Sequence, residues 1–212
     1  MAVSLTRIVK VAPKSTIFFV CDIQTRIKPA IHACDHVINI ANKMLKVAKV
    51  VDIPVLVTEQ NPKGLGSTIP ELALQSLGSL HIGTYSKTLF SMVTPEVTKV
   101  LADRRPHVKS IVLFGVESHV CVLQTALDLL ELEYDVHVLA DGVSSCNKEE
   151  VPWALERMRQ AGVQITTSES IAFQLMVDSA SPNFKPLAGI VKEEKEATRS
   201  ALQTLLPVDH SG

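Results

Sequence analysis

Two short apolar runs constrain the fold of this chain more than any other feature. Residues 15–22 (STIFFVCD) and 110–116 (SIVLFGV) are apolar almost without interruption, whereas a strand with one face in water alternates apolar and polar residues. Each run is therefore expected to be a strand buried on both faces, as in a parallel sheet covered by helices. Longer segments with apolar residues at helical spacing lie between runs of this kind.

Strands and helices alternate along the rest of the chain, which predicts right-handed βαβ units. Thr94 followed by Pro95 is a typical helix start, and Gly162 a typical helix end. We expect an α/β fold, a single-domain three-layer α/β/α sandwich around a mainly parallel, doubly wound, six-stranded sheet. The strands are expected at residues 15–22, 53–59, 79–87, 110–116, 135–141 and 163–169, and the helices at 35–51, from Pro70 onward, 94–105, 119–133 and 148–162.

The expected domain limits follow from the same pattern. A leader loop over 1–14 precedes the domain at 15–195, and a C-terminal helix and tail occupy 196–212. Residues 61–67 (NPKGLGS) are expected to be a loop, and the chain to turn irregular from residue 179 before a charged helix. The first fifteen residues carry three basic side chains and no acid, as some organelle transit segments do, but an ordinary leading loop is the favoured interpretation.

The composition, net charge and cysteine count exclude several classes of protein. With 46% apolar and 20% charged residues and a net charge of −1, the composition is that of a globular domain and does not indicate a nucleic-acid partner. No segment approaches the roughly 20 apolar residues of a membrane span. The four cysteines form no CxxC pair, which is typical of a reducing compartment. We expect a cytoplasmic protein, with the mitochondrion as the alternative that the basic N-terminus allows.

Polar side chains stand at two of the predicted strand ends, where open parallel sheets place their sites. Asp22 follows five apolar residues, a position that is costly for a carboxylate unless it is solvated, hydrogen-bonded or used, and Gln24 lies two residues on. Lys87 ends the third predicted strand. The structural alternatives are a turn aspartate and a solvated surface lysine. The functional interpretation is a lysine beside a carboxylate that helps to hold an anionic nucleophile.

Cys121 lies at the start of the helix that follows residues 110–116. Ser118 is the expected N-cap, which would put Cys121 at the third helical position. Helix N-termini carry free N–H groups and a partial positive charge, which favour a thiolate over a thiol. A buried inert thiol is the alternative, although the apolar stripe of this helix is complete without Cys121. Together, the acid, the lysine and the cysteine form the parts of an activated nucleophile.

Six segments resemble the isochorismatase-like cysteine hydrolase superfamily, which includes nicotinamidases and carbamoyl-amide hydrolases, and within it the eukaryotic isochorismatase domain-containing proteins. The resemblance covers roughly residues 12–190. The segments are CDIQ (21–24), LVTEQNPKGLGST (56–68), SKTLFSM (86–92), GVESHVCVLQTALDLL (115–130), VHVLADGVSS (136–145) and ALERMRQAGVQITTSES (154–170).

The resemblance implies a catalytic triad of Asp22, Lys87 and Cys121. Asp22 would take the thiol proton, Lys87 would support the charge, and Cys121 would attack the substrate carbonyl to give a thioester-type intermediate. It also implies a cis peptide between Val116 and Glu117, with the amides of Glu117 and Cys121 lining the oxyanion hole. The expected pocket residues are Gln24, Glu59, Gln60, Phe90 and His119, although ordinary packing is an equal alternative for them.

Two departures from the superfamily narrow the expected chemistry. Nicotinamidase-like members carry an Asp-x-His and a further His after the second strand as metal ligands, whereas this chain has TEQNPKGLG there. We therefore expect no catalytic metal, no cofactor and a substrate other than nicotinamide. Enzymes that hydrolyse isochorismate itself lack the cysteine, because a vinyl ether needs no thiol attack, so Cys121 argues against that substrate.

The favoured function is hydrolysis of a small-molecule amide or carbamoyl C–N bond. A non-catalytic interaction protein of the same fold is the alternative, and a ribonuclease is a less favoured one. A homo-oligomer is expected, with the apolar end of the C-terminal helix at a subunit contact. Cys34 and Cys146 are expected to be bystanders, and Cys21 to face the core on the side of the sheet away from Asp22.

Overall fold

The computed structural model describes residues 8–206, so Arg7 of the basic N-terminus and the tail from residue 207 lie outside the described part of the chain. Six parallel strands form one sheet in the order β3-β2-β1-β4-β5-β6. This order is that of a doubly wound sheet, with its topological switch beside β1. The strands are β1 (Thr16–Cys21), β2 (Val55–Gln60), β3 (His81–Lys87), β4 (Ser110–Val116), β5 (Asp135–Ser144) and β6 (Gln164–Thr166).

The central strands are buried on both faces, as their continuous apolar runs predict. Every residue of β1 and β4 is buried. Along β1, Phe18 packs into one core, where its ring meets Phe114 edge to face with centroids 6.1 Å apart, while Ile17 and Phe19 pack into the other. The sheet therefore separates two apolar cores, and the expected three-layer α/β/α sandwich is confirmed.

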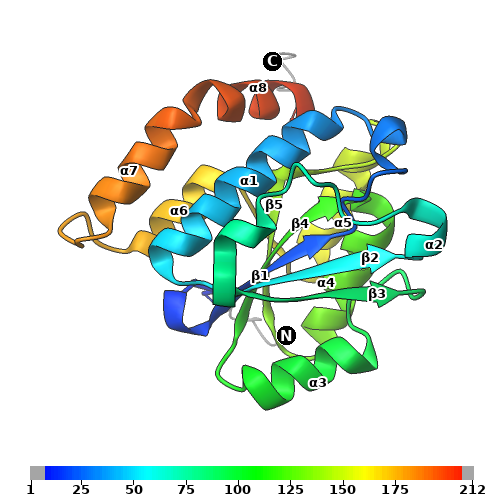
Figure 1. Ribbon diagram of the computed structural model, residues 1–212, viewed down its shortest axis with the longest axis horizontal. Coiled ribbons are helices and arrows are strands. Elements are labelled where there is room, and N and C mark those ends of the chain that lie inside the picture. Colours follow the sequence, from blue (N-terminus) through cyan, green and yellow to red (C-terminus); the bar gives the residue numbers. More distant parts are fainter. Residues whose placement is uncertain (1–7, 207–212) are drawn as a thin grey trace, which may run out of the picture.

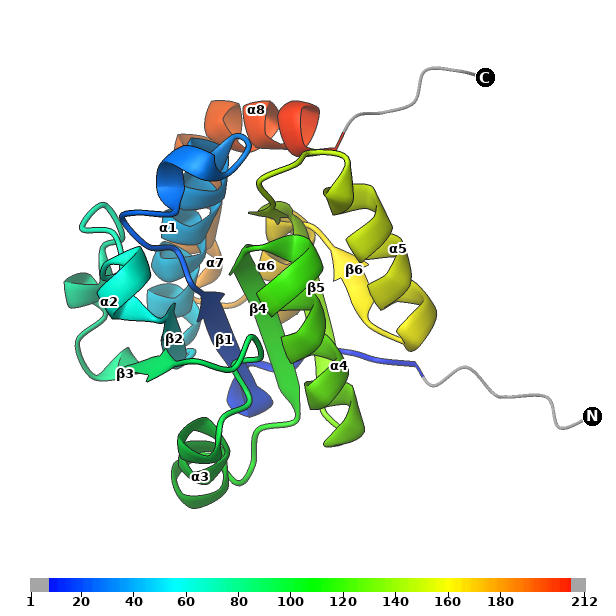
Figure 2. The same ribbon diagram turned by 90° about the vertical axis from the view of Figure 1, so that its right-hand side faces the viewer.

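Helices cover both faces of the sheet (Figures 1 and 2). The first core holds buried residues of α1, α6, α7 and α8, and the second holds those of α3, α4 and α5. Figure 1 shows α1, α6, α7 and α8 grouped together, away from α3 and α4. The helices are α1 (Cys34–Val51), α2 (Pro62–Leu65), α3 (Pro95–Arg104), α4 (Leu123–Glu131), α5 (Glu150–Ala161), α6 (Ser168–Met176), α7 (Phe184–Glu193) and α8 (Lys195–Leu205).

The helix boundaries read from capping residues agree with the structure. Thr94 caps α3, with its hydroxyl oxygen accepting a hydrogen bond from the Val97 N–H at 3.2 Å, and Pro95 is the first helical residue. Gly162 ends α5 with φ 109°, a backbone conformation that L side chains rarely adopt. Both signals are local, which is why the sequence alone could locate them.

Three segments differ from the sequence-based expectation. The loop at 61–67 contains the short helix α2, and the helix expected from Pro70 is replaced by turns of 3₁₀-helix, η3 (Leu74–Leu80), with a break at Gly78. The last strand, β6, is shorter than expected because α6 begins at Ser168, capped by the Thr167 hydroxyl oxygen. Apolar residues at 171, 172, 175 and 176 give α6 a helical pattern that the strand assignment overlooked.

The C-terminal region is more regular than predicted. The charged C-terminal helix is present as α8, but the segment expected to be irregular before it contains helix α7, and only Glu194 separates the two helices. Ala201 and Leu205, on the apolar side of α8, are buried in the same core as α1. Leu202 and Leu206 of the same segment are only partly buried, and residues 207–208 lie outside the described part of the chain, so the expected subunit contact stays a prediction.

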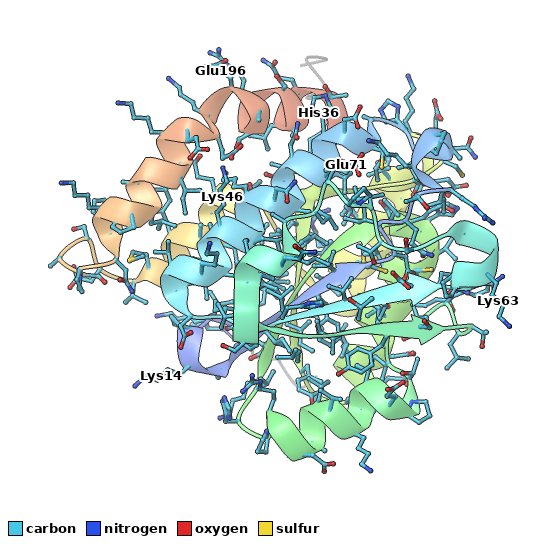
Figure 3. All side chains as sticks on the ribbon, in the orientation of Figure 1. Lys14, His36, Lys46, Lys63, Glu71 and Glu196 are labelled. Atoms are coloured by element: carbon cyan, nitrogen blue, oxygen red, sulfur yellow. The ribbon has the colours of Figure 1, made fainter. Side chains whose placement is uncertain are left out.

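Charged side chains of both signs are spread over the surface (Figure 3). Lys46 on α1 forms ion pairs of 2.6 Å with Glu193 and Glu194. Lys14 and Lys63 lie at opposite edges of the molecule in the same view. This distribution agrees with the near-zero net charge. Among residues 8–206, no helix is both long enough and apolar enough to cross a membrane.

Candidate active site

Asp22 and Lys87 form a buried ion pair at the carboxyl edge of the sheet. The Lys87 Nζ lies 2.7 Å from the Asp22 Oδ2, and the two residues are only 4% and 2% exposed. Asp22 directly follows β1 and Lys87 ends β3, so the pair spans the intervening strand β2. From β2, the Thr58 hydroxyl donates to the Asp22 Oδ1 at 2.8 Å. The parallel register thus joins residues that are far apart in the sequence.

The Lys87 ammonium group has a full set of acceptors. Besides Asp22, it donates to the Gln60 Oε1 at 2.7 Å and to the carbonyl oxygens of Phe90 at 2.8 Å and Leu89 at 3.2 Å. An ammonium group has three protons, and a buried charge is stable only when it is paired and hydrogen-bonded. Lys87 is therefore held as a fixed positive charge at the sheet edge.

Strand β4 passes very close to β1 just before the turn that carries Cys121. Gly115 of β4 has φ 125°, and a Cβ there would lie 2.1 Å from the Cys21 carbonyl oxygen. Only glycine fits where β4 passes β1 so closely. The next peptide bond, Val116–Glu117, is cis, at the position that the family resemblance implies.

Cys121 lies in a π-helical turn, η4 (Ser118–Val122), which leads into α4. The expectation that Ser118 caps this helix is wrong, because Glu117 occupies the N-cap position. The Ser118 hydroxyl is instead buried without a hydrogen-bond partner among the described residues. A π turn winds wider than an α turn, so counting helical positions from a serine cap could not locate Cys121.

Thr125 connects the cysteine turn to the loop that follows Lys87. Its hydroxyl donates to the Cys121 carbonyl oxygen at 2.6 Å and accepts from the Met92 N–H at 2.8 Å. All three residues are buried. The turn bearing the sulfur and the loop bearing two of the Lys87 acceptors are therefore fixed to each other.

Cys21 is buried in the core, as expected, but it also belongs to the site, which the sequence analysis did not predict. Its thiol lies 3.5 Å from the Asp22 Oδ2 and contacts Cys121. Strand alternation predicted that Cys21 and Asp22 face opposite sides of the sheet, but Asp22 has φ 49°, which ends the alternation. Burial first, and then the hydrogen bond with Cys121, raise the pKa of the Cys21 thiol well above its usual range. Cys21 is therefore a protonated neighbour of Cys121.

Gln24 and Gln60 brace the site. Gln24 is fully buried; its Nε2 donates to the carbonyl oxygens of Gln60 and Gly66, and its Oε1 accepts from the Gln60 N–H. Gln60 in turn accepts from Lys87 and donates to the Thr88 carbonyl oxygen at 2.9 Å. The polar atoms of Gln24 are thus used within the protein, and Gln60 positions the ammonium group of Lys87.

The other expected pocket residues differ in exposure and in how they are held. Glu59 is half-buried and accepts hydrogen bonds from the Thr68 N–H and hydroxyl. Phe90 is 51% exposed, and its carbonyl oxygen accepts a hydrogen bond from Lys87. The His119 Nδ1 lies 2.8 Å from the Ser145 hydroxyl. Phe90 is the exposed apolar side chain among them, and the roles of all three stay predictions.

The two remaining cysteines lie in contrasting surroundings. Cys34 is buried at the start of α1, where desolvation raises its pKa to about 11. Cys146 is exposed, and a hydrogen bond with the Glu117 carboxylate raises its pKa. Both thiols are therefore kept protonated near neutral pH, which makes them suitable references for the reactivity of Cys121.

A second buried lysine–aspartate cluster lies on the α1 side of the sheet, and the sequence analysis missed it. The Lys43 Nζ donates to the hydroxyls of Ser168 at 3.1 Å and Thr198 at 3.0 Å. Asp141 accepts from the Ser168 N–H and hydroxyl at 2.8 and 2.6 Å. Desolvation lowers the pKa of Lys43 and raises that of Asp141. Lys43 lies between apolar positions 40 and 47 of α1, a signal that the sequence did contain.

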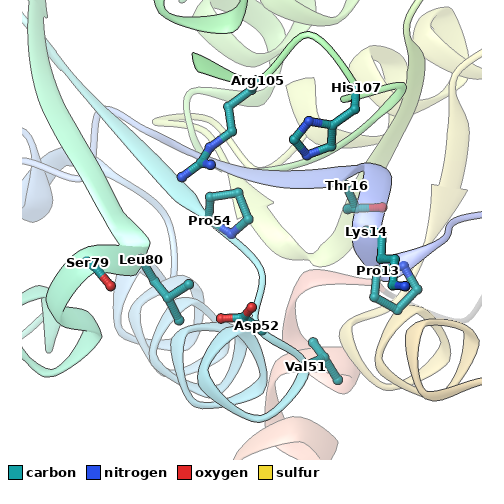
Figure 4. Close-up of a pocket in the computed structure, with 10 residues that line it drawn as sticks. All are labelled: Pro13, Lys14, Thr16, Val51, Asp52, Pro54, Ser79, Leu80, Arg105 and His107. Atoms are coloured by element: carbon teal, nitrogen blue, oxygen red, sulfur yellow. The ribbon is translucent and has the colours of Figure 1, made fainter.

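A cavity of about 760 Å³ lies at the opposite edge of the sheet from the ion pair (Figure 4). Its lining includes Thr16, Pro54 and Leu80, which stand at or just before the amino ends of β1, β2 and β3. Arg105 and His107 complete one wall in the close-up. No cysteine lines this cavity, so its size does not make it the candidate catalytic site.

Comparison with known proteins identifies the class of this chain. Residues 16–170 match the family model described as the isochorismatase domain. The chain is 44% identical over 190 residues to isochorismatase domain-containing protein 2 of Xenopus laevis, covering 90% of each chain. It therefore belongs to the isochorismatase family, within a superfamily of hydrolases.

Solved structures agree with this assignment. MAR1 ribonuclease of Caenorhabditis elegans is 35% identical with a TM-score of 0.78, over 87% of this chain and 93% of that one. The YcaC gene product of Escherichia coli, described as an octameric hydrolase of unknown specificity, is 21% identical with a TM-score of 0.76, over 93% and 96% of the chains. The second likeness supports the fold alone.

Proposed function

We propose that this protein is a cysteine-dependent hydrolase that cleaves the C–N bond of a small amide or carbamoyl compound, with Cys121 as nucleophile. The observation that carries the proposal is the buried ion pair of Asp22 and Lys87, 2.7 Å long, joined to Cys121 through Cys21. Activated nucleophiles lie beside a base that is itself held by a third group. Here Asp22 is the base, and Lys87 and Thr58 hold it.

The reaction proceeds in two halves. Asp22 takes the thiol proton of Cys121, and the sulfur attacks the substrate carbonyl, whose π electrons move to the oxygen. When the tetrahedral intermediate collapses, the C–N bond breaks and the leaving nitrogen takes the proton from Asp22. Water then gives a proton to Asp22 and attacks the thioester, the C–S bond breaks to release the acid product, and the Cys121 sulfur takes the proton from Asp22.

Lys87 contributes charge rather than a proton in this scheme. Its ammonium protons are used by Asp22, Gln60 and the two carbonyl oxygens, so it offsets the negative charge that develops on the sulfur and the carboxylate. The amides of Glu117 and Cys121 are proposed to receive the oxyanion. Exposed Phe90 is proposed to contact the apolar part of the substrate.

The direct test is a panel of small amides and carbamoyl compounds assayed for release of ammonia or amine. The protein is expected to hydrolyse at least one of them and to carry an acyl adduct on Cys121 in mass spectra of quenched reactions. Cys121→Ser should abolish both signals, while Cys34→Ser should keep both. Turnover that survives in Cys121→Ser would contradict the proposal.

Ribonuclease activity is the second candidate, and it rests on the name of the 35% identical worm protein. The buried acid, lysine and cysteine lack the carboxylate–metal or histidine acid–base chemistry that phosphodiester cleavage uses. Cleavage of a labelled RNA by the wild type, but not by Cys121→Ser or Asp22→Asn, would favour this candidate over amide hydrolysis.

A homo-oligomer is also proposed. Trp153 on α5 is 74% exposed, and an exposed tryptophan is typical of protein contacts. The octameric YcaC product shows that this fold can assemble. Sedimentation that yields only a 23.1 kDa species would contradict this proposal.

A further inference from the structure

Three potential metal ligands converge at the carboxyl edge of the sheet, from two different loops. Glu117 and His119 belong to the turn after β4, and Cys146 lies just past the end of β5. One carboxylate oxygen, one imidazole nitrogen and the sulfur all lie within 4.8 Å of one another. In the part of the chain that the structure describes, this is the one group of three or more such side chains.

The ligands are held by hydrogen bonds that a metal site requires. The His119 Nδ1 lies 2.8 Å from the hydroxyl of buried Ser145, which fixes the ring and leaves Nε2 for a metal. The Glu117 Oε2 accepts from the Cys146 N–H at 2.7 Å, which brings the carboxylate over the loop that carries the thiol. Metal-binding histidines typically have their second nitrogen fixed in this way.

We propose that Glu117, His119 and Cys146 bind a Zn²⁺ ion. Sulfur, imidazole and carboxylate are the ligands of zinc sites, and three protein ligands leave a fourth position open. A thiolate and a carboxylate together balance the charge of the ion, and the thiol proton leaves to solvent on binding. Ligand–zinc bonds of about 2.0–2.3 Å place ligand atoms about 3.3–3.8 Å apart, so atoms that lie within 4.8 Å of one another need to approach by at most about 1.5 Å. Cys146 is exposed, and its thiol already hydrogen-bonds the Glu117 carboxylate.

The ion would connect the turn that carries Cys121 to the loop between β5 and α5. Its ligands differ in position from the Asp-x-His and His residues that nicotinamidase-like members carry after the second strand. The site does not depend on the proposed amide hydrolysis, because none of its three side chains takes a proton or forms a bond in that scheme.

Cobalt provides the test, because a thiolate bound to Co²⁺ gives a charge-transfer absorption in the near ultraviolet. The host protein is Cys121→Ser, which removes one of the two thiols beside Asp22; the other, Cys21, is fully buried. Titration is expected to give the band at one Co²⁺ per chain, and one equivalent of Zn²⁺ should displace it, since zinc binds such sites more tightly than cobalt. Adding Cys146→Ser should remove the band, and Cys34→Ser should not. Ser145→Ala should weaken binding by about tenfold.

Thermal unfolding gives a second readout that needs no spectroscopic band. Zn²⁺ that binds the folded chain should raise Tm in the wild type but not in Cys146→Ser. The inference is overturned if the Cys121→Ser host shows no thiolate band, or if the band persists without Cys146. A band seen in the wild type and lost in Cys121→Ser would place the metal on the nucleophile instead, and would also overturn it.

Discussion

Two buried lysine–aspartate clusters on one sheet differ in what surrounds them. Lys87 and Asp22 touch directly, at 2.7 Å, beside two thiols at the sheet edge. Lys43 and Asp141 meet through the Ser168 hydroxyl. The second cluster is closed by Thr198 of α8, and among residues 8–206 its side-chain hydrogen-bond partners are hydroxyls and not thiols. Burial of charge is therefore common to both clusters, and the adjacent thiols distinguish the first one, which is why catalysis is proposed there.

If only the first cluster is catalytic, the largest loss of hydrolysis rate is expected from a change at Asp22. Asp22→Asn removes the proposed base but keeps the shape of the side chain, so the hydrolysis rate should fall by about 10²–10⁴-fold. Lys43→Met, the matched change in the closed cluster, should leave the rate per folded molecule nearly unchanged. Steady-state assays of both variants, normalised to folded protein by circular dichroism, make the measurement. Equal losses in the two variants would remove the distinction between the clusters.

The closed cluster should instead control stability. Lys43→Met leaves the buried Asp141 without its nearby cation and Ser168 and Thr198 without their donor, so the free energy of unfolding should fall by about 1–3 kcal/mol. The double variant Lys43→Met/Asp141→Asn should recover part of that loss, because neither charge then remains buried. Urea denaturation of the four proteins of this cycle measures the coupling. Simple additivity of the two single changes would show that the charges do not interact.

His137, which lies outside both clusters, is expected to make the free energy of unfolding sensitive to acid. Desolvation lowers its pKa to about 4, and its Nε2 has no partner among the described residues. Between about pH 6.5 and pH 4 the unfolded chain therefore binds more protons, so the free energy of unfolding should fall by about 3 kcal/mol as pH is lowered through this window. His137→Gln should flatten that slope in urea denaturation curves recorded at several pH values. The same slope in both proteins would contradict the assignment.

The smallest predicted effects come from one hydroxyl in each cluster. Thr58 donates to Asp22, and Thr198 accepts from Lys43. Thr58→Val and Thr198→Val should each cost about 1 kcal/mol of stability. Only Thr58→Val should also slow hydrolysis, by about fivefold, which is the rate equivalent of that energy. Urea denaturation and hydrolysis assays of both variants test whether the Thr198 hydroxyl affects stability alone while the Thr58 hydroxyl affects both stability and rate.

The sequence was informative where local chemistry determines structure. Continuous apolar runs located β1 and β4, and the polar residues at their ends pointed to Asp22 and Cys121. Cys21 packs in the same core as Ile17 and Phe19, as strand alternation predicts. Its contact with Asp22 was missed because the positive φ of Asp22 ends that alternation, and a six-residue run does not reveal the angle. The π turn at Ser118 was missed for a similar reason, since serine favours an ordinary cap.

Long-range polar contacts were the least predictable part of the molecule. Lys43 reaches Ser168 and Thr198, which are 125 and 155 residues away. Within the candidate site, the contact of Lys87 with Gln60 depends on the pairing of β2 with β3. Such contacts depend on which helix covers which face and on strand register, and neither property is encoded in any one segment.

The most direct test of the account is the reactivity of Cys121. Native protein is treated with sub-stoichiometric iodoacetamide in the presence of a chelator, and the alkylated cysteine is mapped by mass spectrometry from pH 5 to pH 9. The account predicts that Cys121 labels first below pH 8, although it is only 6% exposed and Cys146 is open to solvent, and that Asp22→Asn removes this preference. Labelling of Cys146 first, with Cys121 silent or indifferent to Asp22→Asn, would contradict it.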